Sequence, residues 1–134
     1  MANFNAVSRT NYFEVKDRAA FIAELDKLSF EDMEVFDSQH NPNKIALGGY
    51  SDITVVYDEE KDELVEVFEL IQKHIKEDDA CIFLLAGYEK LRYVVADALV
   101  VTADKFKYIS ARDLALKEAA KMLGIKAFDT CMDY

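Results

Sequence analysis

Residues 81–109 contain three successive runs of apolar, β-branched and aromatic residues, separated by short polar turns. The runs are C-I-F-L-L-A, then L-R-Y-V-V-A-D-A-L-V-V-T, then F-K-Y-I, with turns near G-Y-E-K and at A-D-K. Such runs are typical of β-strands, and connections this short join neighbouring antiparallel strands. The segment therefore predicts three consecutive antiparallel strands, around which any fold of the chain must be built.

The first half of the chain adds further strands and a helix. Residues 9–16 alternate in polarity with β-branched and aromatic content, which predicts a strand, and Asp17 is a suitable N-cap for a helix over residues 18–28. The residues of this helix expected to face the core are Phe21, Leu25 and Leu28. Three short strands are predicted next, over residues 33–37, 44–47 and 53–57, with a bend or bulge at Gly48-Gly49.

Residues 59–76 show the clearest helical pattern. At 100° per residue, the apolar side chains fall in one stripe about 100° wide and the acidic side chains fall on the opposite side. The apolar stripe consists of Leu64, Val67, Phe68, Ile71 and Ile75. The opposite side carries Glu59, Asp62, Glu63, Glu66 and Glu69, with Leu70 projecting among them. We expect an amphipathic helix that presents a row of carboxylates three or four residues apart, about 5–6 Å from one another.

The last helix is predicted from its ends. Ser110 and Asp113 resemble a capping box, with Asp in the place of the preferred Glu or Gln, and Gly124 is well placed as a C-terminal cap. The apolar residues between them are Leu114, Ala115, Leu116, Ala119 and Leu123.

The fold class follows from the order of these elements, which is strand, helix, several strands, helix, three strands, helix. Helices do not alternate with single strands, so a doubly wound parallel sheet is disfavoured. The chain has 134 residues, with one Pro and four Gly, which suits one domain without a linker. We predict a single α+β domain over residues 1–134, with an antiparallel or mixed sheet of about five to seven strands and three helices packed on it.

The net charge of -10 is concentrated in the middle of the chain. Residues 29–79 carry four lysines against fifteen carboxylates, whereas the basic and acidic side chains nearly balance on either side of this segment. A concentrated negative field repels nucleic acid and anionic membrane and attracts basic protein surfaces. Direct binding of DNA or RNA is therefore disfavoured, although the same charge could serve solubility alone.

The expected compartment is the cytoplasm. The N-terminus lacks a basic start followed by an apolar stretch, and no apolar run approaches the roughly 20 residues of a membrane helix. Cys81 and Cys131 stand far apart and outside any zinc-like spacing, which suits a reducing environment.

Few residues suggest catalysis. His74 falls near the C-terminal end of a predicted helix, where a positive charge interacts favourably with the helix dipole. His40 falls in a polar loop, and the sequence indicates no nucleophile for either histidine. Phosphate-binding, hydrolase and zinc motifs are missing from the sequence, and the acidic runs lack the spacing of a calcium loop. We therefore expect no catalytic residues, no metal and no cofactor.

The turn A-G-Y-E-K-L-R-Y at 86–93 is a second candidate contact region. It gathers Tyr88, Glu89 and Arg92, and both Tyr and Arg are residue types that anchor protein interfaces. Ordinary cross-strand pairing, with Arg92 neutralising an acid, explains the same residues.

Three segments carry a resemblance to other proteins. N-F-N-A-V-S-R-T-N-Y-F at the start, G-Y-E-K-L-R-Y-V in the hairpin, and A-L-K-E-A-A-K-M-L-G with M-D-Y at the end resemble a group of small acidic proteins from phages, plasmids and integrative elements of Gram-positive bacteria. No activity is assigned to this group, so the resemblance implies a context and no catalytic residue. It implies an interaction protein of a mobile element, because such proteins often bind host proteins, including nucleic-acid-binding defence enzymes.

Three functions remain open from the sequence. The first is a non-enzymatic protein whose acidic surface binds a basic, nucleic-acid-binding protein, as a DNA mimic or anti-defence inhibitor would. The second is a self-associating regulatory module, such as a homodimer formed through the sheet or the 86–93 hairpin. The third is a small enzyme or ligand-binding fold, which a deep pocket lined by His40, Tyr50 or Arg92 would favour.

Overall fold

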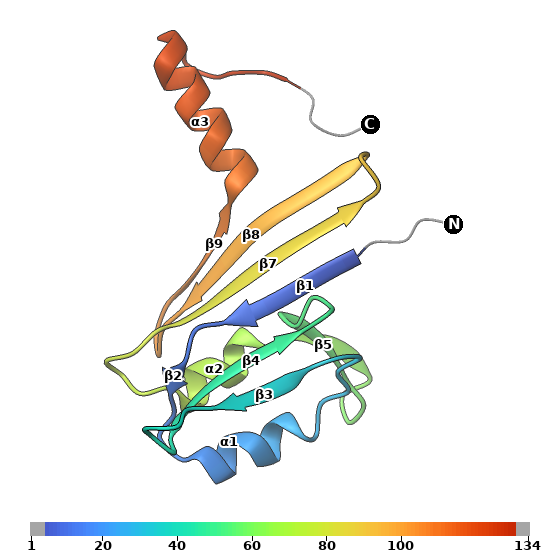
Figure 1. Ribbon diagram of the computed structural model, residues 1–134, viewed down its shortest axis with the longest axis vertical. Coiled ribbons are helices and arrows are strands. Elements are labelled where there is room, and N and C mark those ends of the chain that lie inside the picture. Colours follow the sequence, from blue (N-terminus) through green and yellow to red (C-terminus); the bar gives the residue numbers. More distant parts are fainter. Residues whose placement is uncertain (1–4, 131–134) are drawn as a thin grey trace.

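The structure, a computed structural model, describes residues 5–130 and is built on a seven-stranded sheet in which every neighbouring pair is antiparallel. The strands of this sheet are β1 (Asn5–Thr10), β2 (Phe13–Glu14), β3 (Glu34–Asp37), β4 (Lys44–Gly49), β7 (Cys81–Glu89), β8 (Tyr93–Val101) and β9 (Phe106–Ser110). A second sheet consists of β5 (Val55–Asp58) and β6 (Glu63–Glu66), and the helices are α1 (Arg18–Leu25), α2 (Phe68–His74) and α3 (Ala111–Leu123). The expected α+β class, with a mostly antiparallel sheet and three helices, is confirmed (Figure 1).

The predicted strand over residues 9–16 is divided into β1 and β2. The chain bends at Asn11, whose side-chain amide donates to the Ala80 carbonyl at 3.0 Å and whose Oδ1 accepts from the Ile82 amide at 2.7 Å. An Asn side chain can replace the backbone as a hydrogen-bonding partner in this way. The bend lets β1 pair with β7 and with the end of β4, while β2 pairs with the start of β4.

Gly48 and Gly49 do not form the predicted bend, because β4 continues through both of them. They allow close approach instead. A Cβ on Gly49 would stand 2.1 Å from the Asp32 carbonyl oxygen, and a Cβ on Gly48 would stand 3.1 Å from the Phe36 ring. The two glycines thus make room for the β3 side of the sheet.

The predicted helix over residues 59–76 is wrong for its first half. β5 and β6 form an antiparallel hairpin, and only the Phe68–His74 segment is helical. The Asp58 carboxylate accepts from the amides of Glu60 at 3.0 Å and Lys61 at 3.4 Å, an Asx-type turn that competes with helix. The β-branched residues on either side of this turn, Val56 and Val65, then pair across the strands.

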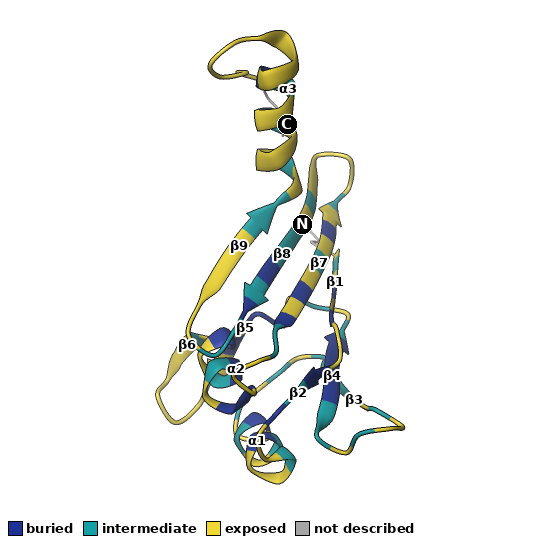
Figure 2. Cartoon of the chain, turned by 90° about the vertical axis from the view of Figure 1, so that its left-hand side faces the viewer, coloured by how far each residue is buried: buried dark blue, intermediate teal, exposed yellow. Residues whose placement is uncertain are grey.

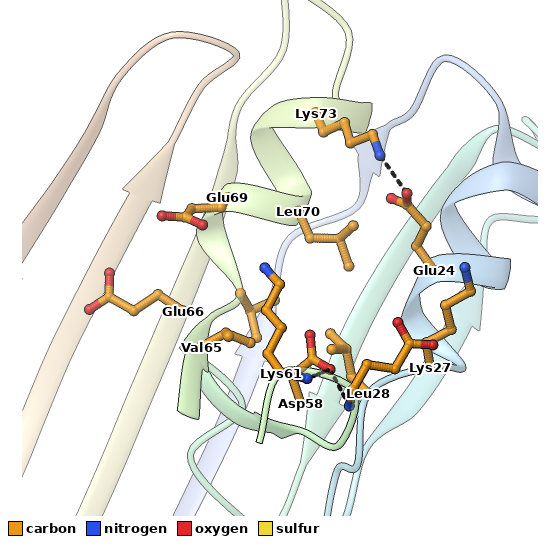
Figure 3. Close-up of a pocket in the computed structure, with 12 residues that line it drawn as sticks. Glu24, Lys27, Leu28, Asp58, Lys61, Val65, Glu66, Glu69, Leu70 and Lys73 are labelled. Atoms are coloured by element: carbon orange, nitrogen blue, oxygen red, sulfur yellow. Dashed lines mark hydrogen bonds and ion pairs between the residues drawn. The ribbon is translucent and has the colours of Figure 1, made fainter. Parts of the chain in front are cut away.

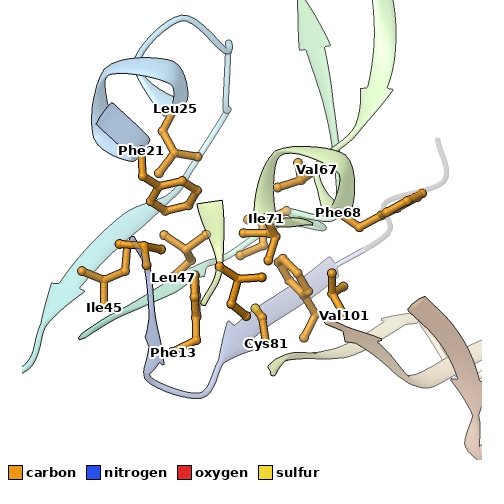
Figure 4. Packing of buried hydrophobic residues seen from close by; sticks show 14 of the residues in the cluster. Phe13, Phe21, Leu25, Ile45, Leu47, Val67, Phe68, Ile71, Cys81 and Val101 are labelled. Atoms are coloured by element: carbon orange, nitrogen blue, oxygen red, sulfur yellow. The ribbon is translucent and has the colours of Figure 1, made fainter. Parts of the chain in front are cut away.

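The core lies between one face of the large sheet and a layer formed by α1, α2 and the hairpin (Figure 4). From α1 and α2 it receives Phe21, Leu25, Phe68 and Ile71, together with Val67 at the N-cap of α2, and from the sheet it receives Phe13, Ile45, Leu47, Cys81, Phe83, Leu99 and Val101. The expected core positions Phe21 and Leu25 are buried, and Leu28 packs against the same cluster.

The opposite face of the large sheet, here called the outer face, has no covering layer among the described residues. Side chains alternate along β7, so Cys81 and Phe83 are buried while Ile82 and Leu84 are 37% and 60% exposed. Figure 2 shows this alternation along the strand. α3 follows β9 directly and extends beyond the end of the sheet, so that α1 and α2 cover the sheet while α3 projects from it (Figures 1 and 2).

Candidate functional site

The negative charge of the molecule is densest on the β5–β6 hairpin, residues 55–66, here called the acidic hairpin. It carries six carboxylates and a single lysine, Lys61. The expected surface residues Glu59 and Asp62 lie in its turn, Glu63 and Glu66 begin and end β6, and Glu69 lies in the first turn of α2. These carboxylates therefore do not form one row along a helix, as we had expected.

Three of the carboxylates hold the turn. Asp58 caps it as described above, and Asp62 has a left-handed φ of 52° and accepts a hydrogen bond from the Tyr57 hydroxyl. Glu59 Oε1 accepts from the Ser29 hydroxyl at 3.0 Å, next to the backbone bridge between Ser29 and Tyr57. Glu63, by contrast, pairs with Asp58 through the backbone, while its side chain is exposed and makes no hydrogen bond or ion pair within residues 5–130.

The outward face of the acidic hairpin has an apolar centre. Tyr57 pairs with Leu64 across the strands, and Val55 pairs with Glu66 beside them. Leu64 is 70% exposed and Tyr57 is 38% exposed. An exposed Tyr–Leu pair flanked by carboxylates resembles the usual protein interface, in which apolar and aromatic side chains form the centre and charges form the rim.

Leu64 and Leu70 exchange their expected roles. The helical pattern placed Leu64 in the core and Leu70 among the acids, whereas Leu70 packs against the core and Leu64 faces solvent. The β-branched and aromatic run V-V-Y before the polar turn residues D-E-E-K-D, followed by L-V after them, was the signal that could have revealed the hairpin. It also marks Tyr57, which sequence reasoning had left out of the site.

A pocket of about 330 Å³ lies beside the acidic hairpin, between α1 and α2 (Figure 3). Leu28, Val65 and Leu70 form its apolar part, and lysines and carboxylates alternate around them. Figure 3 shows Glu66 and Glu69 pointing away from Leu70, on the far side from Glu24. Burial and the Glu66 carboxylate raise the pKa of the Tyr108 hydroxyl, so Glu66 is directed towards β9.

Glu24 links the two helices at the edge of this pocket. Its carboxylate accepts from Lys73 Nζ at 2.5 Å and contacts Nε2 of His74, the last residue of α2. The hydrogen bonds from Lys73 and His74 hold the pKa of the Glu24 carboxyl below its usual value. His74 is buried, and its ring lies 5.3 Å from that of Phe21.

The second candidate region, around residues 86–93, is the turn between β7 and β8. Glu89 Oε1 lies 3.9 Å from Arg92 Nη1, and Tyr88 is 52% exposed on the outer face. This turn and the acidic hairpin lie towards opposite ends of the molecule (Figures 1 and 2). The structure therefore does not bring the two predicted groups of contact residues together.

The remaining residues of interest are scattered. His40 lies in an exposed loop where its amide donates to Ser38 Oγ at 3.2 Å. Cys81 is a free, buried thiol whose pKa is raised by burial, and Cys131 lies outside the described residues. Within residues 5–130, no cluster of three or more His, Cys, Asp or Glu is placed to hold a metal ion. In the same range, no helix has the length and apolar character needed to cross a membrane.

Comparison of the chain with protein-family models, with curated proteins and with solved structures finds no match.

Proposed function

We propose that this chain is a non-enzymatic interaction protein that binds a protein partner with a basic surface through the acidic hairpin. The observation that carries the proposal is the exposed Tyr57–Leu64 pair and the carboxylates beside it. In interfaces of this anatomy a few apolar or aromatic residues supply most of the affinity. The surrounding charges steer association and select the partner.

The partner class follows from the charge. Residues 29–79, which include the acidic hairpin, carry the whole negative excess of the chain. A surface of this sign attracts a lysine- and arginine-rich groove, such as that of a nucleic-acid-binding protein, and repels nucleic acid itself. Together with the resemblance to proteins of mobile elements, this supports a cytoplasmic anti-defence inhibitor or another regulator of a basic host protein.

Capture of the partner tests the proposal. The tagged protein is used to retain proteins from bacterial lysate at about 0.05 M and 0.5 M NaCl, with mass spectrometric identification, because electrostatic association is screened by salt. We expect a basic nucleic-acid-binding protein to be retained at low salt and released at high salt. The purified pair is then titrated with variants.

The variants separate this site from general charge. Leu64→Ala should weaken binding on the order of tenfold or more, as loss of an interface anchor does. Glu63→Lys should slow association and reduce its salt dependence. Glu77→Lys, an equal change of charge at an exposed turn outside the acidic hairpin, is the control and should have little effect. An equal loss of affinity in all three variants would contradict the proposal. So would failure to capture a basic partner at either salt concentration.

A further inference from the structure

The outer face of the large sheet carries an apolar groove of about 440 Å³. Its lining is almost entirely apolar and includes Val7, Leu84, Ala86, Ala96, Ala98 and Ile109. Val7 and Leu84 are 46% and 60% exposed, and Val94 beside them is 64% exposed. Contiguous apolar surface of this kind on a soluble domain marks a site of association.

α3 carries a second uncovered apolar surface. At 100° per residue, five apolar residues of the helix fall within a sector of about 120° that also contains Arg112, while Leu114 lies on the opposite side beside Lys117 and Lys121. The apolar stripe consists of Ala115, Leu116, Ala119, Met122 and Leu123. Met122 is 78% exposed and Leu123 is 60% exposed, although a stripe of this kind normally faces a core.

Within one chain, only the first turn of α3 reaches the groove, through Ala111 and Leu114. β9 ends at Ser110 and α3 begins at Ala111, so no loop allows the helix to fold back over the sheet. Ser110 has extended φ and ψ of -108° and 129°, and its side chain accepts from the Asp113 amide at 3.3 Å, which fixes the start of the helix. α3 therefore continues away from the end of the sheet for about 20 Å, at 1.5 Å per residue (Figure 1).

The total exposed area of the chain is larger than expected for a compact monomer of its mass. The chain exposes 9166 Å² at a mass of 15.3 kDa, whereas the scaling for folded monomers gives about 7,100 Å². The difference is on the order of 2,000 Å² per chain. Even half of it exceeds the roughly 800 Å² per partner of a standard interface.

We propose that a second copy of this chain covers the outer face, with α3 of each copy lying in the groove of the other. Such an exchange is a closed two-fold arrangement, in which the same two surfaces are buried twice. In this arrangement, the apolar stripe of α3 packs against the sheet of the other copy, which the stripe does not reach in its own chain. It leaves the acidic hairpin, on the opposite side of the sheet, free for another partner.

The oligomeric state tests the inference directly. Sedimentation of the full chain at micromolar concentration should give a dimer of about 31 kDa, twice the mass of one chain, that persists at 1 M NaCl because its contacts are apolar. Leu84→Lys on the sheet and Met122→Glu on α3 should each weaken dimerisation on the order of a hundredfold. Leu64→Lys, on the acidic hairpin, replaces a residue of similar exposure outside the groove and should leave the dimer intact.

The pairing of α3 with the sheet is tested by cross-linking. In a Cys131→Ser background, a mixture of Leu84→Cys and Met122→Cys chains should form a disulfide-linked heterodimer under mild oxidation, faster than either variant alone. Circular dichroism of each variant verifies that the monomer fold is kept. A chain that is monomeric at tens of micromolar, or a dimer weakened no more by Leu84→Lys and Met122→Glu than by Leu64→Lys, would overturn the inference. Neither result bears on the partner captured by the acidic hairpin.

Discussion

At the scale of single residues, the close packing of neighbouring atoms limits which side chains can replace Gly48 and Gly49. Both lie inside β4, where a glycine normally weakens a strand. The Cβ that Gly49 lacks would overlap the backbone of Asp32, whereas the Cβ that Gly48 lacks would stand 3.1 Å from the Phe36 ring and 3.4 Å, an ordinary contact distance, from the Ser8 carbonyl oxygen. A side chain can rotate away from such a contact, but a carbonyl held in a packed segment cannot.

Gly49→Ala should therefore destabilise the fold by about 1–3 kcal/mol, the usual cost of an added atom in a packed site. Gly48→Ala is the matched control and should cost less, because a smaller unfolded-state entropy offsets part of its strain. Urea unfolding monitored by circular dichroism measures both. An equal loss in the two variants, or a larger loss for Gly48→Ala, would contradict the geometry at Asp32.

Glu24 gives the fold a dependence on acid. Because Lys73 and His74 hold its pKa in the folded state below the unfolded value, its ionised form stabilises the fold above the unfolded pKa. That contribution is lost as the pH falls through the folded pKa. Its size is below about 1 kcal/mol, since the pair with Lys73 is largely exposed to solvent.

Glu24→Gln should accordingly lower the free energy of unfolding near pH 7, and the difference from the natural chain should shrink between about pH 5 and pH 3. Urea titrations across this range give the measurement. Glu77→Gln, an exposed carboxylate in a turn, serves as the control. A difference that stays constant or grows towards pH 3 would show that the contacts of Glu24 with Lys73 and His74 do not act through its charge.

At the scale of secondary structure, the region around residues 55–76 is compatible with two structures. Its apolar residues from Leu64 onward fit a helical stripe, whereas the β-branched and aromatic run V-V-Y before a polar turn is typical of a strand. Sequence periodicity does not choose between them, because the Val56–Val65 pairing that favours the hairpin requires a partner strand. α3 shows the opposite case, since its Ser110 and Gly124 caps define it locally and both occur where we predicted them.

The two leucines of this segment distinguish the alternatives. In the hairpin, Leu64 is exposed and Leu64→Ala should change the free energy of unfolding by less than about 0.5 kcal/mol. Leu70 packs on the core, so Leu70→Ala should cost about 1–2 kcal/mol, less than a fully buried leucine. Chemical denaturation of both variants gives these free energies of unfolding. A larger loss of stability for Leu64→Ala than for Leu70→Ala would favour the continuous helix.

At the scale of the whole molecule, its two faces differ in chemistry. On the core face, α1, α2 and the acidic hairpin cover the sheet, and together they carry half of the net negative charge. The outer face and α3 expose apolar side chains that no other described element covers. This division allows one surface to hold two copies of the chain together while the other meets a basic partner.

The sequence by itself determined the features that depend on neighbouring residues. It predicted the three strands between residues 81 and 110, both caps of the last helix and the concentration of charge in the middle of the chain. Periodicity, short turns and caps are local signals, which explains why these predictions are confirmed.

Only the tertiary structure decided which residues meet across the chain. It turned residues 55–66 into a hairpin, exchanged the roles of Leu64 and Leu70, and placed Tyr57 at the centre of the candidate site. Strand pairing and burial depend on segments distant in sequence, and a shift of one residue in pairing reverses the face of every side chain. The uncovered outer face is likewise a property of the assembled sheet, because α3 begins without a loop at the end of its edge strand.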